Sequence, residues 1–179
     1  MRVISGKYKG SKIDGFNIDG TRPTMDRVKE SVFAMIQMNI KNSICLDLFA
    51  GSGNLGIEAL SNGSKKVYFV DKNEKATKYI SNNLKRIGIN EEYEIMTCDY
   101  DMALKRLCDN KEKFDIVFLD PPYKLNFINE VLKKLVNMDL LRDGALIVCE
   151  YDKEEVESNV LTLIKMKKYG DKYIRIYKK

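Results

Sequence analysis

The sequence contains no histidine and no tryptophan, and only 3 of its 179 residues are proline. Without histidine, the chain has no Ser-His or Cys-His nucleophile pair and no histidine ligand for a metal ion. Four cysteines are present, but no two of them show the Cys-x-x-Cys spacing of zinc sites and dithiol redox motifs. We therefore expect no metal, and we expect reduced cysteines, with Cys45, Cys98 and Cys149 buried among apolar residues.

Long apolar runs are also missing. No apolar run reaches the roughly 18 residues of a membrane-spanning helix. Residues 1–7 lack the apolar block of a signal peptide, so we expect a cytoplasmic protein. The length predicts one domain, and 44% hydrophobic with 32% charged residues is typical of a soluble globular fold.

Basic charge is concentrated at both ends of the chain. Residues 1–12 contain four basic residues and no acid, and residues 165–179 contain seven basic residues and one acid. Because the net charge of the whole chain is +5, the residues between these ends carry a net charge of −5. Clustered basic charge favours a polyanionic partner such as nucleic acid, although solvated basic ends would show the same pattern.

Strand-like and helical segments alternate from residue 44 onward, which predicts parallel βαβ units. No segment of helical length separates the last two strands, so these should pair antiparallel. We predict an α/β fold with a mostly parallel seven-stranded sheet, one antiparallel strand and helices on both faces. The expected strands cover residues 44–49, 66–70, 93–97, 114–119, 145–149, 161–166 and 173–177, and the expected helices cover 55–60, 74–87, 101–107 and 127–136.

The first 20 residues contain four glycines, and the short runs at residues 2–4 and 11–13 predict a β-hairpin extension of the same domain. The main domain then covers residues 21–179. It begins with a helix in which apolar residues recur at helical spacing from Met25 to Ile36, and Thr24 is a suitable N-cap.

A glycine-rich turn follows the first expected strand. Gly51, Gly53 and Gly56 match the G-x-G-x-x-G pattern, which lets the backbone approach a ligand and also occurs in dinucleotide-binding proteins. A tight turn that binds nothing would show the same pattern. Asp47 lies inside the otherwise apolar strand, where a carboxylate is costly without partners, and it suits a cationic ligand or turn amides better than a pyrophosphate.

The next two expected strands are also followed by acids. Asp71 comes 20 residues after Gly51, at the spacing of a carboxylate that accepts both ribose hydroxyl groups of a nucleoside cofactor. Asp99 could accept a hydrogen bond from an adenine amino group. Either residue could instead cap the helix that follows it.

The fourth expected strand ends at Asp120-Pro121-Pro122-Tyr123, which contains two of the three prolines. Because proline donates no backbone hydrogen bond and fixes its φ angle, carbonyl groups here are free to accept. The Asp120 carboxylate and one carbonyl can accept both N–H bonds of an exocyclic amine, while the Tyr123 ring stacks on the base. This motif predicts a site for a planar base, and a strand-ending turn with a buried tyrosine is the alternative.

These motifs resemble those of the RsmD-type bacterial small-subunit ribosomal RNA (guanine-N2)-methyltransferases. The Asp-Pro-Pro-Tyr segment resembles the catalytic motif of amino-group methyltransferases, and residues 46–56 resemble their cofactor motif. The segment TRPTMDRVKESVF at residues 21–33 resembles the family's more specific signature, and residues 1–6, 53–60 and 169–171 also fit. Two residues depart from the expected pattern: Ala34 replaces an asparagine, and Asn54 replaces a smaller residue.

The resemblance implies a Rossmann-like S-adenosylmethionine-dependent methyltransferase fold and methyl transfer from S-adenosylmethionine to the N2 amine of a guanine in 16S ribosomal RNA. It implies a substrate within an assembled or assembling small ribosomal subunit, and we expect a monomer. The implied catalytic residues are Asp120, Pro121, Pro122 and Tyr123. The implied cofactor-binding residues are Asp47, Phe49, Gly51, Gly53, Asn54, Asp71, Lys72, Asp99 and Tyr100, and the implied RNA-binding residues are Arg2, Lys7, Lys9, Lys12, Arg22, Arg27, Lys172 and Arg175.

Three other functions are compatible with parts of the sequence. An adenine-N6 or cytosine-N4 methyltransferase would share the Asp-Pro-Pro-Tyr motif, but the chain has no room for a large target-recognition domain. A nicotinamide-dependent oxidoreductase fits the glycine spacing and Asp71 but not Asp47. A ribosome-assembly factor without activity would keep the fold, yet every polar group expected for catalysis is present.

Overall fold

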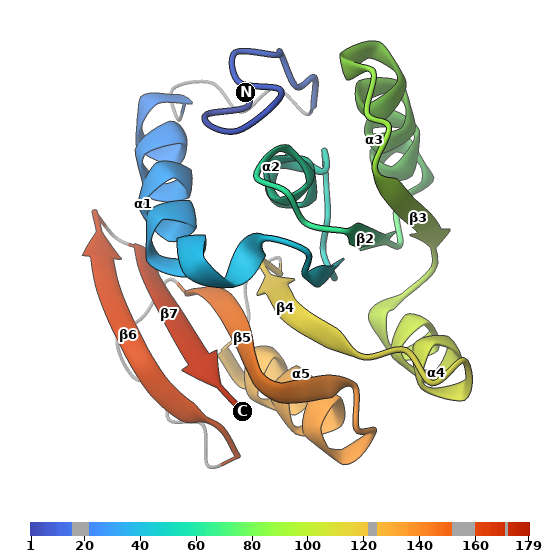
Figure 1. Ribbon diagram of the computed structural model, residues 1–179. Helices are drawn as coiled ribbons and strands as arrows, with labels where there is room; N and C mark the ends of the chain where they lie inside the picture. The colour runs from blue at the N-terminus through green and yellow to red at the C-terminus, as the bar shows by residue number, and fades with distance from the viewer. Residues whose placement is uncertain (16–21, 122–124, 152–159, 171) are drawn as a thin grey trace.

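The computed structural model describes residues 1–15, 22–121, 125–151, 160–170 and 172–179, with the backbone alone for residues 22–25, 125 and 126. A seven-stranded sheet with the order β3-β2-β1-β4-β5-β7-β6 forms the centre of the molecule (Figure 1). The strands are β1 (Ile44–Asp47), β2 (Lys66–Asp71), β3 (Glu92–Thr97), β4 (Phe114–Leu119), β5 (Leu141–Tyr151), β6 (Thr162–Tyr169) and β7 (Lys172–Lys178).

The sheet has a single reversed strand. Neighbouring strands from β3 to β5 pair in parallel, whereas β7 pairs antiparallel with both β5 and β6. The carboxyl ends of β1 to β6 therefore lie at one edge of the sheet, together with the amino end of β7. We call this side the carboxyl edge and the opposite side the amino edge. The predicted mostly parallel sheet with one antiparallel strand is confirmed.

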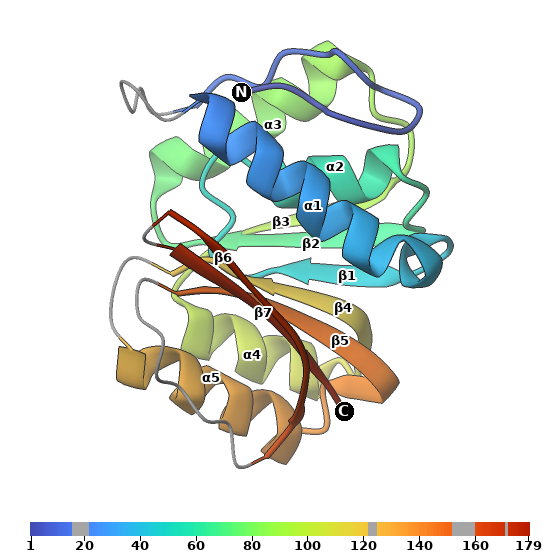
Figure 2. The same ribbon diagram turned by 90° about the vertical axis from the view of Figure 1, so that its left-hand side faces the viewer.

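Helices cover both faces of the sheet (Figure 2). The first face carries α1 (Arg22–Ile40), α2 (Asn54–Ser61) and α3 (Glu74–Ile87), and the second carries α4 (Tyr100–Asp109) and α5 (Leu125–Asn137). In the part of the chain that the structure describes, no helix is long and apolar enough to cross a membrane.

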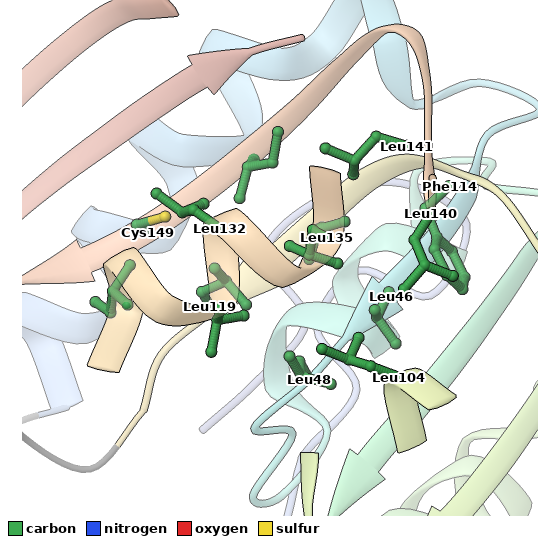
Figure 3. Close-up of a cluster of buried hydrophobic side chains, with 14 of the residues drawn as sticks. Leu46, Leu48, Leu104, Phe114, Leu119, Leu132, Leu135, Leu140, Leu141 and Cys149 are labelled. Atoms are coloured by element: carbon green, nitrogen blue, oxygen red, sulfur yellow. The ribbon is translucent and has the colours of Figure 1, made fainter. Parts of the chain in front are cut away.

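Each face has its own buried core. The core beneath α4 and α5 includes Leu46, Leu119, Leu132 and Cys149 (Figure 3). The core beneath α1 to α3, which we call the α1-side core, includes Val32, Phe69, Ile80 and Phe118. Because both faces are covered, the central strands are apolar throughout, and in β4 only Asp115 is partly exposed.

Several element boundaries differ from the predicted ones. Gly88, at φ 75°, ends α3 as predicted. Strand β5 begins at Leu141, four residues before the expected start, and β1 ends at Asp47, two residues early. Helix α1 begins at Arg22, so Thr24 lies within its first turn and is not its N-cap. Pro23 is tolerated there, because the first-turn N–H groups have no partner within the helix.

The predicted N-terminal hairpin is present only in outline. Arg2 and Lys12 form one isolated antiparallel bridge instead of two strands. Val3 and Ile13 are buried in the α1-side core, so this N-terminal segment (residues 1–15) packs on the main fold. The division at residue 20 lies outside the described residues and stays a prediction.

A buried ion pair joins α1 to α2. The Lys29 Nζ atom lies 2.8 Å from Glu58 Oε2, and the two side chains are 2% and 0% exposed. Lys29 Nζ also donates to the backbone oxygen of Arg2 at 2.6 Å and to Asn54 Oδ1 at 2.7 Å. Burial lowers the pKa of Lys29, and the charge of Glu58 opposes that shift.

Glu58 binds the N-terminal segment at the same time. Its carboxylate accepts hydrogen bonds from the backbone N–H groups of Ile4 and Ser5, at 2.9 Å and 2.8 Å, and from Ser5 Oγ at 2.9 Å. A buried carboxylate is tolerated only with such partners. One side chain of α2 therefore fixes both α1 and the N-terminal segment.

We expect Glu58→Gln to lower the free energy of unfolding by about 3–5 kcal/mol, because it leaves the Lys29 ammonium buried without a counter-charge. The matched control is Glu74→Gln, which breaks the exposed Glu74–Lys78 pair and should have far less effect. Urea unfolding of the wild type and both variants measures the difference. Similar losses in the two variants would contradict this role of Glu58.

Candidate functional site

Acidic side chains follow four neighbouring strands at the carboxyl edge. In order across the sheet they are Asp99 after β3, Asp71 in β2, Asp47 in β1 and Asp120 after β4. Ligands of open parallel sheets bind at this edge. The topology thus gathers four of the sequence-predicted site residues on one side of the molecule.

Glycines shape the turn between β1 and α2. Gly53 is the N-cap residue of α2 and has a φ of 80°, a left-handed conformation that residues with a side chain rarely adopt. A Cβ atom at Gly56 would lie 2.2 Å from Cε1 of Phe69, so glycine lets α2 pack closely on β2. These two residues bring the amino end of α2 against the carboxyl ends of β1 and β2.

Asp47 is the buried acid of the site. It is 3% exposed, and its Oδ2 atom accepts a hydrogen bond from the Gly56 N–H at 2.9 Å. Burial raises the pKa of Asp47 to about 7, the Gly56 hydrogen bond opposes the shift, and the charges of Asp120 and Asp71 add to it. Among the described residues no group donates to its Oδ1 atom, so that oxygen is available to a ligand.

Asp71 links two turns at the end of β2. Its Oδ2 atom accepts from the Gly51 N–H at 2.9 Å, and its Oδ1 atom accepts from the Asn73 N–H at 2.8 Å. The helix cap expected as the alternative role belongs to Asn73, which accepts from the Lys75 N–H. Each Asp71 oxygen can accept a second hydrogen bond. The neighbouring Lys72 is exposed.

Asp99 caps α4. Its Oδ1 atom accepts a hydrogen bond from the Met102 N–H at 2.9 Å, which confirms the alternative role considered for it. The structure describes no donor to its other oxygen. The cap therefore holds the carboxylate at the carboxyl edge and leaves one oxygen for a further partner.

Three aromatic rings pack together beside Asp99. Tyr100 and Phe127 meet edge to face with centroids 4.6 Å apart, and Phe49 lies 5.4 Å from Phe127 and 6.0 Å from Tyr100. The Tyr100 hydroxyl donates to Glu130 Oε1 at 3.0 Å. Two predicted cofactor residues thus belong to an apolar cluster that also includes Phe127.

Asp120 directly follows β4 and is exposed to solvent. No described group donates a hydrogen bond to its carboxylate. The dense protein surroundings and the charge of Glu150 raise the pKa of Asp120 to about 7, while Lys172 acts in the opposite direction. Pro121 is partly buried, and Pro122 and Tyr123 lie outside the described residues.

The predicted RNA-binding residues separate into two groups. Lys7 and Lys9 belong to the turn of the N-terminal segment that meets Ser61, the last residue of α2, and Lys7 pairs with Glu91 beside the start of β3. That turn lies toward the amino edge. Arg2, which pairs with Asp26 of α1 at 3.2 Å, and the exposed Arg27 lie near the amino end of α1 and thus toward the carboxyl edge.

The other predicted basic residues fall in different places. Lys12 is exposed and pairs with Asp14, and Lys172 pairs with Glu150 at the carboxyl edge. Arg22 begins α1, but its side chain is not described. Arg175 is only 3% exposed and lies over the Tyr151 ring at 5.0 Å. The prediction that Arg175 contacts RNA is therefore wrong, because its position in β7 turns the side chain into the core.

Sequence reasoning missed Lys29, Glu58 and Glu150. A lysine and a glutamate within otherwise apolar helix faces were a visible signal for the buried pair, because an unpaired buried charge is not tolerated. Asn54, predicted to bind cofactor, accepts a hydrogen bond from Lys29 through its side chain. Glu150 directly follows the strand expected at residues 145–149, as Asp120 follows the strand expected at 114–119, although in the structure Glu150 lies within β5.

Asp47 makes the stability of the fold depend on pH. The pKa of its carboxyl rises from an ordinary 3.8 to about 7 on folding, so its favourable contribution is complete below pH 4 and is lost as the pH rises to 7. We expect Asp47→Asn to gain stability relative to wild type over this range, by up to about 4 kcal/mol. Urea unfolding at pH 4, 5.5 and 7.5 measures the free energy of unfolding of both proteins. If that free energy changed with pH in the same way in both, this role of Asp47 would be contradicted.

The sequence of this chain matches one family model and is similar to those of known bacterial proteins. Residues 1–178 match the family model described as Conserved hypothetical protein 95. The chain is 40% identical to the Bacillus subtilis protein YlbH over 182 residues, which cover 100% of this chain and 99% of YlbH. It is 35% identical over 179 residues to the Ribosomal RNA small subunit methyltransferase D of Haemophilus influenzae, with 99% of this chain and 93% of that protein covered.

Solved structures confirm the expected fold class. The magnesium protoporphyrin IX methyltransferase of Synechocystis, solved with bound S-adenosylmethionine, superposes with a TM-score of 0.67 at 16% identity, covering 92% of this chain and 85% of that chain. At this identity the likeness shows the shared fold alone. The two sequence matches extend over nearly the whole chain, and the chain therefore belongs to the RsmD-type family of bacterial ribosomal RNA methyltransferases, described as Conserved hypothetical protein 95.

Proposed function

We propose that this protein transfers a methyl group from S-adenosylmethionine to the exocyclic N2 amine of a guanine in small-subunit ribosomal RNA. The observation that carries the proposal is the carboxylate of Asp120, which lies at the carboxyl edge beside Asp47 and receives no hydrogen bond from a described group. Such an acceptor suits the N–H groups of a base amine. The Haemophilus influenzae relative is named as a small-subunit ribosomal RNA methyltransferase.

The cofactor half of the site would comprise the ends of β1, β2 and β3. The open Oδ1 atom of Asp47 fits the ammonium group of the methionine part, a pairing that burial strengthens. Gly51 and Gly53 let the backbone approach this part closely, and Asn54 orients the first turn of α2 through Lys29. The ligand's positive charge would offset the crowding of Asp47 and Asp120.

The nucleoside part fits the two neighbouring strand ends. Asp71 can accept the ribose hydroxyls on lone pairs that the turn amides leave free, with Lys72 beside it. Asp99 can accept the adenine amine on its second oxygen. The apolar cluster of Phe49, Tyr100 and Phe127 offers the adenine ring a surface to pack against.

The chain's contribution to the chemistry is mainly orientation. When bound, S-adenosylmethionine supplies a methyl group activated by a positively charged sulfur. Asp120 and the Pro121 carbonyl accept the two amine hydrogens of guanine, which draws the nitrogen toward tetrahedral geometry and directs its lone pair. The family resemblance assigns to Tyr123, which lies outside the described residues, the role of stacking on a base that has left its helical stack. Because the pKa of Asp120 is raised to about 7, its carboxylate can also take the proton that the nitrogen loses.

The test uses labelled S-adenosylmethionine and small ribosomal subunits from a strain that lacks the enzyme. After incubation, the RNA is digested and the labelled nucleoside is identified by mass spectrometry. Label in N2-methylguanosine supports the proposal. Label in N6-methyladenosine or N4-methylcytidine would show that guanine is the wrong base, while methyl transfer to an exocyclic amine would stand. No label despite cofactor binding would favour an assembly factor without activity, and stabilisation by NAD instead of S-adenosylmethionine would favour an oxidoreductase.

We expect Asp120→Asn to lower the transfer rate by about 100-fold or more, because the acceptor and proton carrier becomes neutral. Cofactor affinity, measured by calorimetry, should change little. The control is Asp139→Asn, at a surface turn before β5 near the amino edge, which should leave the rate unchanged. A near-normal rate in Asp120→Asn would overturn its assignment.

We further propose that RNA phosphates bind around the carboxyl edge. Arg2, Arg22 and Arg27 provide this charge at the amino end of α1, and the exposed Lys12 lies opposite Arg2 in the N-terminal segment. Lys167 and Lys168 extend it along the last residues of β6, where Lys167 Nζ donates to Ser31 Oγ at 3.2 Å and Lys168 lies over the Tyr173 ring. The proposed substrate is found in the cytoplasm, and we propose that the protein acts there as a monomer.

A matched pair of double variants can distinguish the contributions to RNA binding of the basic residues at the carboxyl edge and at the amino edge. Lys167→Gln with Lys168→Gln, near the carboxyl edge, should reduce the slope of log affinity against log salt concentration by about 1 to 2. Lys7→Gln with Lys9→Gln removes the same charge near the amino edge and should reduce the slope much less. Filter binding of small-subunit RNA at increasing KCl measures both. Equal slopes in the two variants would contradict the proposed RNA surface.

A further inference from the structure

Two carboxylates lie side by side next to the proposed base site. β4 and β5 pair in parallel register up to Leu119 and Cys149, so the next residues, Asp120 and Glu150, continue neighbouring strands about 4.8 Å apart. Side chains alternate between faces along a strand. Phe118 and Val148 face the α1-side core, so Asp120 and Glu150, two residues further, lie on that same face.

Lys172 completes this row on the next strand. Glu150 is opposite Ile174 in the antiparallel pair of β5 with β7, and Ile174 also belongs to the α1-side core. Lys172, two residues before Ile174, therefore lies on the same face. Its Nζ atom donates to Glu150 Oε1, and the two side chains are 46% and 21% exposed. Across β4, β5 and β7 the carboxyl edge thus presents two acceptors followed by one donor. The acceptors are the carboxylates of Asp120 and Glu150, and the donor is the ammonium group of Lys172.

The side-chain lengths let these groups converge. A strand separation of about 4.8 Å is wider than the spacing of neighbouring groups on a base edge. Aspartate, glutamate and lysine become longer with each strand away from β4, and the contact of Lys172 with Glu150 shows that the outer groups reach inward. Because β5 lies between β4 and β7 in the sheet, Glu150 and Lys172 lie on the two strands next to Asp120, and the charges of both shift the pKa of the Asp120 carboxyl.

Guanine has the complementary hydrogen-bonding edge. Its N2 amine and its N1–H are neighbouring donors, and its O6 is an acceptor. Adenine and cytosine each present an amine next to a ring nitrogen that accepts. A second carboxylate would face that nitrogen's lone pair, so both bases would leave a polar group unpaired and meet repulsion.

We propose that Glu150 and Lys172 determine specificity for guanine, with Glu150 accepting from N1–H and Lys172 donating to O6 while Asp120 holds the N2 amine. This inference rests on the proposed function, because it describes how the same site recognises its base. In the absence of the base, the contact with Lys172 orients the Glu150 carboxylate. Glu150 is then a specificity-determining residue and Asp120 remains the group that acts on the amine.

The test changes the base and keeps the methyl acceptor. Once the target nucleotide is known, it is replaced in the RNA by 2-aminopurine, which retains the amine but has an acceptor at N1 and no O6. We expect the wild-type kcat/KM for guanine to exceed that for 2-aminopurine by about 100-fold or more, because two charge-assisted hydrogen bonds are lost. Equal values for the two bases in the wild type would overturn the inference.

The variant Glu150→Gln then assigns the discrimination to this residue. The glutamine amide can donate to the N1 atom of 2-aminopurine, so the ratio of the two kcat/KM values should fall by about tenfold or more. The matched control is Glu91→Gln. Glu91 forms a similarly exposed pair with Lys7, 20% and 57% exposed, but lies near the amino edge. In Glu91→Gln the ratio of kcat/KM for guanine to kcat/KM for 2-aminopurine should stay at the wild-type value.

The outcomes separate the inference from the proposed function. If the wild type labels the N2 amine of guanine but Glu150→Gln keeps the wild-type ratio, then the Glu150–Lys172 pair only joins strands and the inference fails alone. If the wild type labels no guanine N2 amine, the proposed function fails and the inference fails with it. Unfolding curves and cofactor affinity of Glu150→Gln confirm that the folded protein is being compared.

Discussion

The buried carboxylate of Glu58 is the constraint on which the arrangement of the site depends. It lies at the contact of α2, α1 and the N-terminal segment, and it is fully buried, so all of its partners must be in place together. Lys29 extends the same network to Asn54 at the start of α2. The proposed RNA-binding residues of α1 therefore cannot shift independently of the turn proposed to hold the cofactor. This network also gives a structural role to Asn54, which departs from the expected family pattern.

The acids of the carboxyl edge have two different roles. Those at the ends of β1, β2 and β3 fix turns or a helix end, whereas the acid after β4 does not. Asp47, Asp71 and Asp99 each use one or two oxygens to fix a turn or a helix end, so they are positioned before any ligand binds. Within the described residues no group donates such a bond to Asp120, which leaves its lone pairs for the proposed substrate. An edge this rich in acids repels phosphate groups. The basic residues accordingly lie around it, on α1 and β6, where they can bind the RNA backbone while one base reaches the acids.

The parts of the structure set by local pattern could be predicted from the sequence. Alternating strands and helices gave the sheet, and strand ends gave Asp47, Asp71, Asp99 and Asp120 as candidates. Contacts between distant segments could not be predicted. The Lys29–Glu58 pair depends on how α1 packs on α2, and the burial of Arg175 depends on which face of β7 meets the core. Basic composition alone treated the two chain ends as one RNA-binding surface, whereas the fold places Lys7 and Lys168 at opposite edges of the sheet.

The proposed reading of guanine follows from this same separation of tasks. A single carboxylate with a carbonyl neighbour accepts any exocyclic amine, so the roles proposed for Asp120 and Pro121 account for the proposed chemistry but not for the choice of base. Discrimination requires a group whose partner exists only on guanine, and an acceptor opposite N1–H meets that condition. The register of β4 with β5 supplies such an acceptor in Glu150, and the reversed direction of β7 brings the amino-terminal Lys172 to the same edge. Were β7 parallel to β5, its carboxyl-terminal residues would lie there instead, and Glu150 would lose the lysine whose positive charge offsets the repulsion between two neighbouring carboxylates.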